Sequence, residues 1–285
     1  MDRILFGDNQ FFAVNHMSDE KARAQAIRFK DIQAVIEILD HVYDIGIRTF
    51  MCTTHDRIAE VCDHIRDNPG RYDGFRIYPC MPYAHKYNNA VAELGVIGAL
   101  KKMLPGSVIG TMARGGIALV RKDYIDIMKL LVDAEMKMFQ GIETGVIFLQ
   151  NIVTDLLLGM GMSDFFVAFA DYVRVKYRAE PGFITMNLPR LLDVLEKCGI
   201  QNPIICASIN KIGFRMPGGL DVYEKTIASG RCQVIAMQPL AAGAIPPREA
   251  MKYVCSQKGI QSVLFGASTK AHIQQSKDFI ENYSL

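Results

Sequence analysis

The sequence predicts a single-domain (β/α)8 TIM barrel, and three observations support this fold class. Short apolar runs alternate with helical patterns along the whole chain and can be grouped into eight strand–helix units. The runs are continuously apolar, which is typical of parallel strands buried on both faces. The 285 residues exceed the roughly 250 that such a barrel needs. A doubly wound sheet is the alternative fold. Such a sheet would usually divide the chain into two halves joined by a linker, and this sequence has no Pro/Ser-rich linker.

Eight apolar runs are expected to form the strands. They are residues 3–11, 47–55, 75–83, 144–150, 182–187, 203–210, 232–241 and 260–268. The fourth run has the weakest strand pattern, and an extra helix is expected before it. Within the single domain 1–285, the segment 105–162 is therefore the part with the least defined element boundaries.

The segments between these runs show helical spacing. In residues 29–46 one face carries Ile32, Val35, Ile36, Leu39 and Val42, and Gly46 ends the helix. Pro189 falls in the first turn of another helix, where proline is favoured. The helices are expected at 29–46, 56–68, 88–104, 122–139, 163–177, 188–199, 219–230, 246–259 and 270–283.

Composition narrows the class of protein. The net charge of +2 gives no case for a nucleic-acid partner or a membrane surface, and no apolar stretch reaches the ~18 residues of a transmembrane helix. The seven cysteines are scattered and never form a C-x-x-C pair, which indicates reduced thiols in a cytoplasmic protein. A small-molecule substrate is expected, and the sequence does not indicate the oligomeric state.

Polar residues that follow the strands are the candidates for chemistry, since barrels of this class build their active sites at the carboxyl ends of the strands. Asp8 follows the first strand, where it could orient a base, act as one, or only cap a loop. His55 follows the second strand and suits general acid–base catalysis. The alternative is that Thr54 or Asp56 caps the next helix and His55 is merely exposed.

Two further candidates follow other strands. His85, with Lys86 beside it, could act as His55 does or be solvated. Lys211 follows the sixth strand, where a desolvated lysine could form a Schiff base with a carbonyl substrate. Alternatively, Lys211 points outward or pairs with a phosphate. No H-x-H or H-x-x-E motif accompanies these residues, so no metal is expected.

The loops after the last two strands favour phosphate binding, because barrels often hold a phosphate there against a helix N-terminus. Small residues in "MQPLAAGAI" would let the backbone approach a ligand closely. In "FGASTKAHI", Ser268, Thr269 and Lys270 would meet at a helix start, although an ordinary capped loop is the alternative. "GTMARGG", at 110–116, does not match the G-x-G-x-x-G pattern and is a weak nucleotide signature.

The last hundred residues resemble the aldo-keto reductases. The likeness lies in "GFITMNLPRLLDVLEKCGI", "ASINKIGFR", "VIAMQPLAAGAI" and "SVLFGASTKAHIQQ". It implies a nicotinamide cofactor, NADP or NAD. The residues that it implies for binding this cofactor are Thr185 and Asn187 at the nicotinamide amide, Asn210, Gln238, and Ser268, Thr269 and Lys270 at the adenosine phosphate.

The first half of the chain departs from that family. The family's catalytic tetrad is Asp and Tyr after strand two, Lys at strand three and His at strand four. In "GIRTFMCTTHDR", Met51 falls where the Asp should be, and His55 or Asp56 where the Tyr should be. "FRIYPCMPYAHK" has no lysine in place, and "VIFLQN" has no histidine. The family's N-terminal hairpin is missing too.

These observations predict an atypical aldo-keto-reductase-like oxidoreductase that acts on a carbonyl or alcohol, with His55 and either Asp8 or His85 as its proton donor. A second hypothesis is a non-redox carbonyl enzyme (a lyase, aldolase or isomerase) acting on a phosphate-bearing substrate, with Lys211 or the two histidines moving protons. A third is a pseudoenzyme that binds a ligand without turnover.

Overall fold

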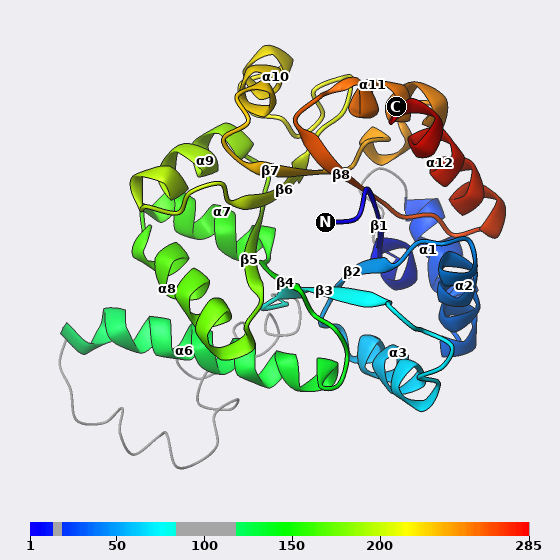
Figure 1. Cartoon of the computed structure of the whole chain (residues 1–285), viewed down its shortest axis with the longest axis horizontal. Helices are drawn as coiled ribbons and strands as arrows, with labels where there is room; N and C mark the ends of the chain where they lie inside the picture. The colour runs from blue at the N-terminus through cyan, green and yellow to red at the C-terminus, as the bar shows by residue number, and fades with distance from the viewer. Residues whose placement is uncertain (14–18, 84–117, 285) are drawn as a thin grey trace.

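The computed structural model of the chain describes residues 1–13, 19–83 and 118–284. Eight parallel strands close into a barrel in chain order, and helices surround it (Figure 1). The strands are β1 (Ile4–Gly7), β2 (Thr49–Thr53), β3 (Arg76–Met81), β4 (Val146–Leu149), β5 (Glu180–Thr185), β6 (Ile204–Ser208), β7 (Gln233–Met237) and β8 (Ile260–Phe265). The predicted single-domain barrel is confirmed.

The register of β1 shows how the barrel closes. Phe6 of β1 is opposite Phe50 of β2 on one side and Phe265 of β8 on the other. Since side chains alternate across a strand, these phenylalanines point outward to the helices, and their neighbours fill the barrel interior. The interior cluster of buried residues is Leu5, Met51, Tyr78, Cys80, Val146, Phe148, Ile184, Ile204, Cys206 and Ile235.

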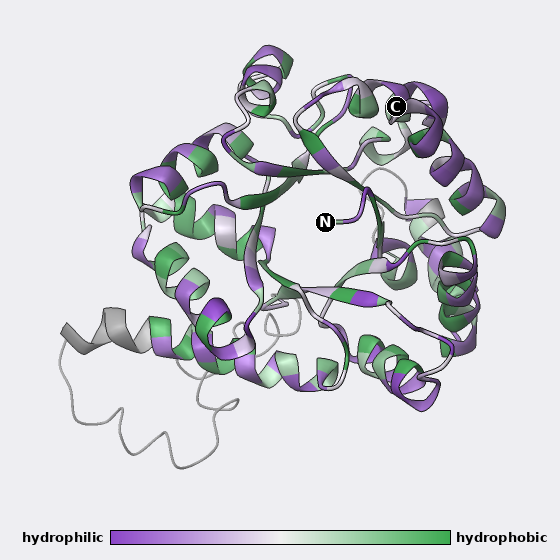
Figure 2. Ribbon diagram, in the orientation of Figure 1, coloured by the Kyte–Doolittle hydropathy of each residue, from purple (hydrophilic) through white to green (hydrophobic). Residues whose placement is uncertain are grey.

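The outer layer consists of α1 (Asp19–Arg28), α2 (Ile32–Asp44), α3 (Asp56–Asp67), α6 (Ala118–Met136), α7 (Asn151–Met160), α8 (Asp164–Tyr172), α9 (Leu188–Lys197), α10 (Leu220–Ala228), α11 (Pro247–Ser256) and α12 (Lys270–Tyr283). Most of these helices turn an apolar face to the barrel and a polar face to solvent (Figure 2). In α2, for example, Val35, Leu39 and Val42 are buried. Gly46 has a φ of 91°, which glycine adopts at low cost when it follows a helix.

Most of the predicted strands and helices are present in the described ranges. All eight strands form, and the helix expected at 122–139 is α6, which precedes β4. Two helices were not predicted. Helix α1 follows a short 3-10 helix, η1 (Asn9–Phe12), and α7 lies in a stretch whose nearly uniform apolar character hides the helical period. The helix expected at 88–104 and the "GTMARGG" segment lie outside the described residues.

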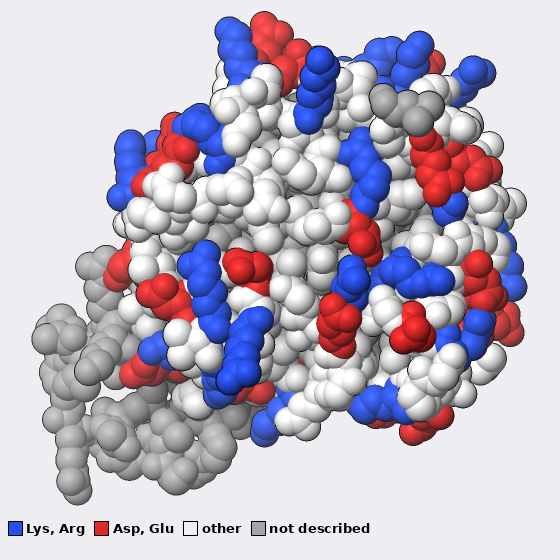
Figure 3. Space-filling view, viewed as in Figure 1, with Lys and Arg blue, Asp and Glu red and all other residues white. Residues whose placement is uncertain are grey.

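The distribution of charged side chains on the surface agrees with the small net charge of the sequence. Acidic and basic side chains are interspersed on the face in Figure 3, and neither sign forms a continuous field there. Within the described ranges, the structure contains no helix whose length and hydropathy would let it span a membrane.

Candidate active site

A cavity of about 460 Å³ opens at the carboxyl ends of the strands. All eight strand ends contribute to its wall, which is the position where barrels of this class carry their chemistry. The contributing residues are Gly7, Met51, Thr53, Cys80, Ile184, Cys206, Met237, Leu264 and Phe265, with Gln150 directly after β4. This cavity is therefore the candidate active site.

Asp8 is a buried acid in this wall, and only 6% of its surface is exposed. Its Oδ2 accepts hydrogen bonds of 2.7 Å from both the backbone N–H and the hydroxyl of Thr53. Burial raises the pKa of the Asp8 carboxyl from its ordinary value, and the bonds from Thr53 offset part of that rise. A carboxyl group with a raised pKa inside a cavity can exchange protons with a bound molecule.

Tyr83 brings a second protic group to the same cavity. Burial raises the pKa of its hydroxyl, and the negative charge of Asp8 raises it further. The backbone N–H of Tyr83 donates to both oxygens of Glu135 at 3.1 Å, and the hydroxyl of Thr54 donates to Glu135 Oε2 at 2.5 Å. Glu135 is buried, so this carboxylate of α6 fixes the chain where it leaves β2 and β3.

The floor of the cavity is rich in sulfur. Met51, Met186 and Met237 line it together with Cys80 and Cys206. Burial raises the pKa of both thiols, so they remain protonated at neutral pH. A protonated buried thiol is a poor nucleophile, and these cysteines act as apolar packing groups.

His55 lies next to the cavity wall. Its Nδ1 accepts a 3.1 Å hydrogen bond from the N–H of Arg57, so His55 itself is the N-cap of α3, and the alternative cap at Thr54 or Asp56 is wrong. The imidazole stacks on Phe12, with the ring centres 4.2 Å apart, and its centre is 6.0 Å from that of Tyr83. Phe12 and Tyr83 line the cavity, and His55 packs against both of them.

The residues that the family likeness implied at β5 and β6 make hydrogen bonds within the chain. The fully buried hydroxyl of Thr185 donates to Asp155 Oδ1 at 2.5 Å and accepts from the N–H of Asn187. Asn187 caps α9 through the N–H of Arg190. The buried Asn210 bonds twice to the backbone of Phe214. These three residues organise the loops around the cavity and do not line it.

The loops after β7 and β8 do border the cavity. Gln238 lines it, has a φ of 55°, and accepts a 2.8 Å hydrogen bond from Ser208. Ser268 accepts a hydrogen bond from Gln25 of α1, and Thr269 is the N-cap of α12, whose first residue is the exposed Lys270. Gln25 also lines the cavity, so the predicted phosphate end lies next to it.

The remaining catalytic candidates lie elsewhere. Lys211 is half exposed, with its Nζ 3.0 Å from Glu249 of α11. This placement matches the alternative in which Lys211 points outward, because a Schiff-base lysine needs a desolvated environment. His85 and Lys86 lie outside the described residues. In the described part of the chain, no three His, Cys, Asp or Glu side chains group in a way that could hold a metal ion.

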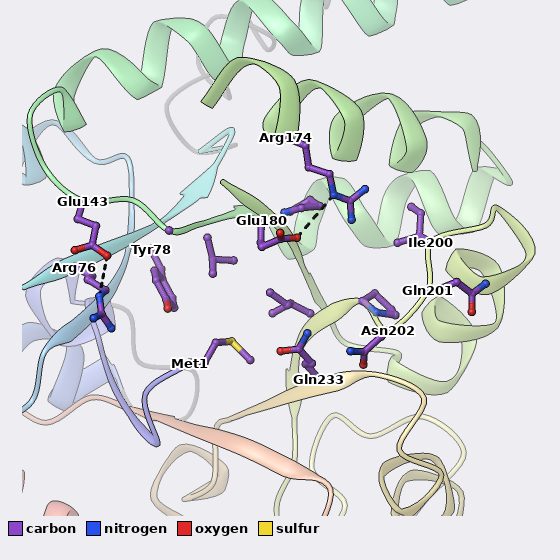
Figure 4. A pocket seen from close by; sticks show the side chains of 15 residues that line it. Met1, Arg76, Tyr78, Glu143, Arg174, Glu180, Ile200, Gln201, Asn202 and Gln233 are labelled. Atoms are coloured by element: carbon purple, nitrogen blue, oxygen red, sulfur yellow. Dashed lines mark hydrogen bonds and ion pairs between the residues drawn. The ribbon is translucent and has the colours of Figure 1, made fainter. Parts of the chain in front are cut away.

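A second cavity of about 560 Å³ lies at the opposite end of the barrel, where the strands begin. Its charged side chains pair with one another: Arg76 with Glu143 at 2.9 Å, and Arg174 with Glu180 at 3.8 Å (Figure 4). Tyr78 lies between these pairs, and burial raises the pKa of its hydroxyl. Since residues at this end of a barrel usually serve stability, the first cavity is the better candidate for chemistry.

Comparison with known proteins supports the fold. Neither a protein-family model nor a curated protein sequence matches the chain. Solved structures do match. One is a protein of Pseudomonas aeruginosa described as an aldo-keto reductase, at 11% identity and a TM-score of 0.59, over 99% of this chain and 90% of the other. A second, described as a 2,5-diketo-D-gluconic acid reductase B, has 12% identity and a TM-score of 0.55, over 99% and 86% of the two chains.

A variant of the protein Gox0644 in complex with NADPH also matches, at 9% identity and a TM-score of 0.54 over 90% of this chain and 81% of that one. At these identities the likeness establishes the fold. The residues of the aldo-keto reductase tetrad are not matched in this chain. The chain therefore shares the (β/α)8 barrel fold of these solved structures.

Proposed function

We propose that the protein is an oxidoreductase that acts on the carbonyl or alcohol group of a small molecule with a nicotinamide cofactor. The observation that carries the proposal is the position of Asp8, a buried carboxyl with a raised pKa in the wall of the cavity at the active-site end of the barrel. Reduction of a carbonyl needs one acid at the oxygen that becomes a hydroxyl.

Asp8 is the proton donor in this proposal. The two bonds from Thr53 both end on Oδ2, so they hold the carboxyl in one orientation. Tyr83 stays protonated and can donate a hydrogen bond to the substrate oxygen in the same cavity. His55 then supports Phe12 and Tyr83, in place of the donor role that the sequence alone favoured.

The β7 and β8 side of the cavity wall supports the cofactor part of the proposal. Two small residues there, Ala242 and Gly243, would allow a close approach of a ligand to the backbone. Gln25, whose Nε2 donates to Ser268, has a buried side-chain oxygen, Oε1, with no hydrogen-bond partner among the described residues. When bound, the nicotinamide would supply or accept the hydride, while Gln238, Ser268, Thr269 and Lys270 would contact the rest of the cofactor.

Titration with NADPH and with NADH, followed by fluorescence and calorimetry, tests the proposal. Saturable binding of either cofactor is expected, and Asp8→Asn should bind it as tightly as the wild type while losing turnover. If neither cofactor binds at millimolar concentration, the oxidoreductase proposal fails.

One observation favours a second candidate, a non-redox carbonyl enzyme such as a lyase or isomerase. The hydroxyl of Thr185 is already bonded to Asp155, and Asn187 caps a helix, so the pair implied for the nicotinamide amide is occupied. Asp8 and Tyr83 could move protons on a substrate without a hydride step. Turnover of a carbonyl substrate in the absence of NADPH and NADH would favour this candidate.

The cellular setting is also a proposal. Five of the seven cysteines are buried and none is paired, which suits a reducing compartment such as the cytoplasm. The expected partner is a small molecule.

A further inference from the structure

Arg215 is a cation on the rim of the candidate active site. It follows β6 and is the single positively charged side chain that lines this cavity within the described parts of the chain. Among the same lining residues, Asp8 is the acid, and its hydrogen bonds go to Thr53 and not to Arg215. Arg215 is therefore the positive charge that the described wall offers to a ligand.

The backbone holds Arg215 in an uncommon conformation. Its φ is 56°, in the left-handed region that favours glycine. The residue before it, Phe214, bonds through both its N–H and its C=O to the side chain of the fully buried Asn210. The residue after it, Met216, is buried. These fixed neighbours make the position of Arg215 a property of the fold and not of a loose loop.

The side chain of Arg215 has no acidic partner in the described residues. Its guanidinium carbon lies 5.3 Å from the centre of the Phe214 ring. Phe214 packs with Leu240 against the segment after β7, so the guanidinium is held on the side of the cavity that Gln238 and Gly243 also line. Lys211, by contrast, is neutralised by Glu249.

A planar guanidinium in this setting suits an oxyanion, since arginine binds phosphate and carboxylate oxygens through two parallel hydrogen bonds. Sparsely populated backbone conformations are also found often at ligand sites. We propose that Arg215 binds a phosphate-type oxyanion of the molecule that occupies the cavity. The identity of that molecule rests on the proposed function: the phosphate could belong to the dinucleotide cofactor or to the substrate.

A glycine substitution tests the role of the Arg215 side chain without straining the backbone. Arg215→Gly removes the guanidinium and relieves the backbone strain, so it should fold as well as the wild type. Arg178 provides a matched control, since it is also an exposed arginine with a positive φ, 53°, and it does not line the cavity. Arg178→Gly should change neither folding nor binding, and Arg215→Lys should keep part of the binding.

Calorimetric titration with inorganic pyrophosphate is the first measurement. The wild type and Arg178→Gly should bind it with the same Kd, and Arg215→Gly should bind it about tenfold to a hundredfold more weakly. Equal binding by Arg215→Gly and the wild type, with unchanged thermal midpoints, would overturn the proposal.

Two further titrations identify the source of the oxyanion. A weaker Kd of Arg215→Gly for NADPH assigns the site to the cofactor. A weaker Kd for a phosphorylated three-carbon aldehyde, with NADPH binding unchanged, assigns it to the substrate. If the wild type binds both ligands and Arg215→Gly binds both with the same Kd as the wild type, the proposal is contradicted. If the wild type binds pyrophosphate through Arg215 but does not bind NADPH, the proposed oxidoreductase function fails while this inference stands.

Discussion

Asp8 and Thr53 join the carboxyl ends of β1 and β2 through two hydrogen bonds of 2.7 Å, one from the Thr53 N–H and one from its hydroxyl, both to Asp8 Oδ2. The pair fixes a buried acid in the wall of the cavity. Burial raises the pKa of this acid and the two bonds lower it, so the strength of the pair determines when Asp8 can give up its proton.

Replacing Asp8 with asparagine keeps the shape of the side chain and removes the acid. Turnover of Asp8→Asn should fall by about 10²–10⁴-fold, the usual contribution of a positioned general acid. Steady-state kinetics would measure the loss. Asp221→Asn, an exposed aspartate in the first turn of α10, is the control and should keep full activity. Full activity in Asp8→Asn would show that Asp8 is not the acid.

The hydroxyl of Thr53 should control the pH profile. Its hydrogen bond favours the charged carboxylate, so Thr53→Val should raise the pKa of Asp8 further. Because Asp8 acts in its protonated form in the reduction, the basic limb of the kcat/KM profile should move to higher pH. Thr53→Ser keeps a hydroxyl and should leave the profile in place. A shift to lower pH in Thr53→Val would contradict the assignment.

Asp8 should also make stability depend on pH. Since its pKa in the folded state is raised above 3.8, the native state binds the proton more tightly than the unfolded state does, and wild-type stability falls as the pH rises through the interval between the two pKa values. Asp8→Asn does not titrate there. Its free energy of unfolding relative to the wild type should therefore increase as the pH rises above about 4. Urea denaturation at several pH values would measure this, and a constant difference would argue against a raised pKa.

Glu135 should act through Tyr83. It accepts hydrogen bonds from the Tyr83 N–H and the Thr54 hydroxyl in a buried position, so Glu135→Ala should lose about 2–3 kcal/mol of stability. Glu135→Gln keeps one acceptor oxygen and should recover part of this loss. Because Glu135 positions Tyr83, Glu135→Ala should lower kcat more than it changes KM. Equal stability of the wild type and Glu135→Ala by chemical denaturation would exclude this role.

Gly182 tests the packing inside the barrel. A Cβ at this position of β5 would overlap the fully buried ring of Phe148 on β4. Gly182→Ala should therefore destabilise the protein by about 1–3 kcal/mol. In the double variant with Phe148→Leu the two costs should not add, because the smaller side chain makes room. Additive costs in thermal denaturation would mean that the two residues do not meet.

The sequence was sufficient to predict the barrel because its strands are buried on both faces and appear as apolar runs. It did not predict α7, where a nearly uniform apolar composition hides the helical period. Helix α1 was missed as well, because its segment is polar and has no marked apolar face. The helix α6 was expected from its pattern, but its buried Glu135 was not singled out.

The candidate site was predicted in part. Asp8 and Gln238 were expected from their places after β1 and β7, and both line the cavity. The parts contributed by Glu135 and Arg215 depend on contacts between segments far apart in the chain, and no local spacing encodes them. Thr185 had the position expected for a binding residue, but the partner that occupies its hydroxyl, Asp155, is 30 residues away in the sequence.

The most direct test of the central claim is a crystal structure of the protein with NADPH. The account predicts the nicotinamide ring inside the cavity at the carboxyl ends of the strands, beside Asp8 and Tyr83, with the phosphates toward the loops after β7 and β8. A cofactor bound elsewhere on the chain, such as in the cavity between Arg76 and Arg174 at the opposite end of the barrel, would contradict it.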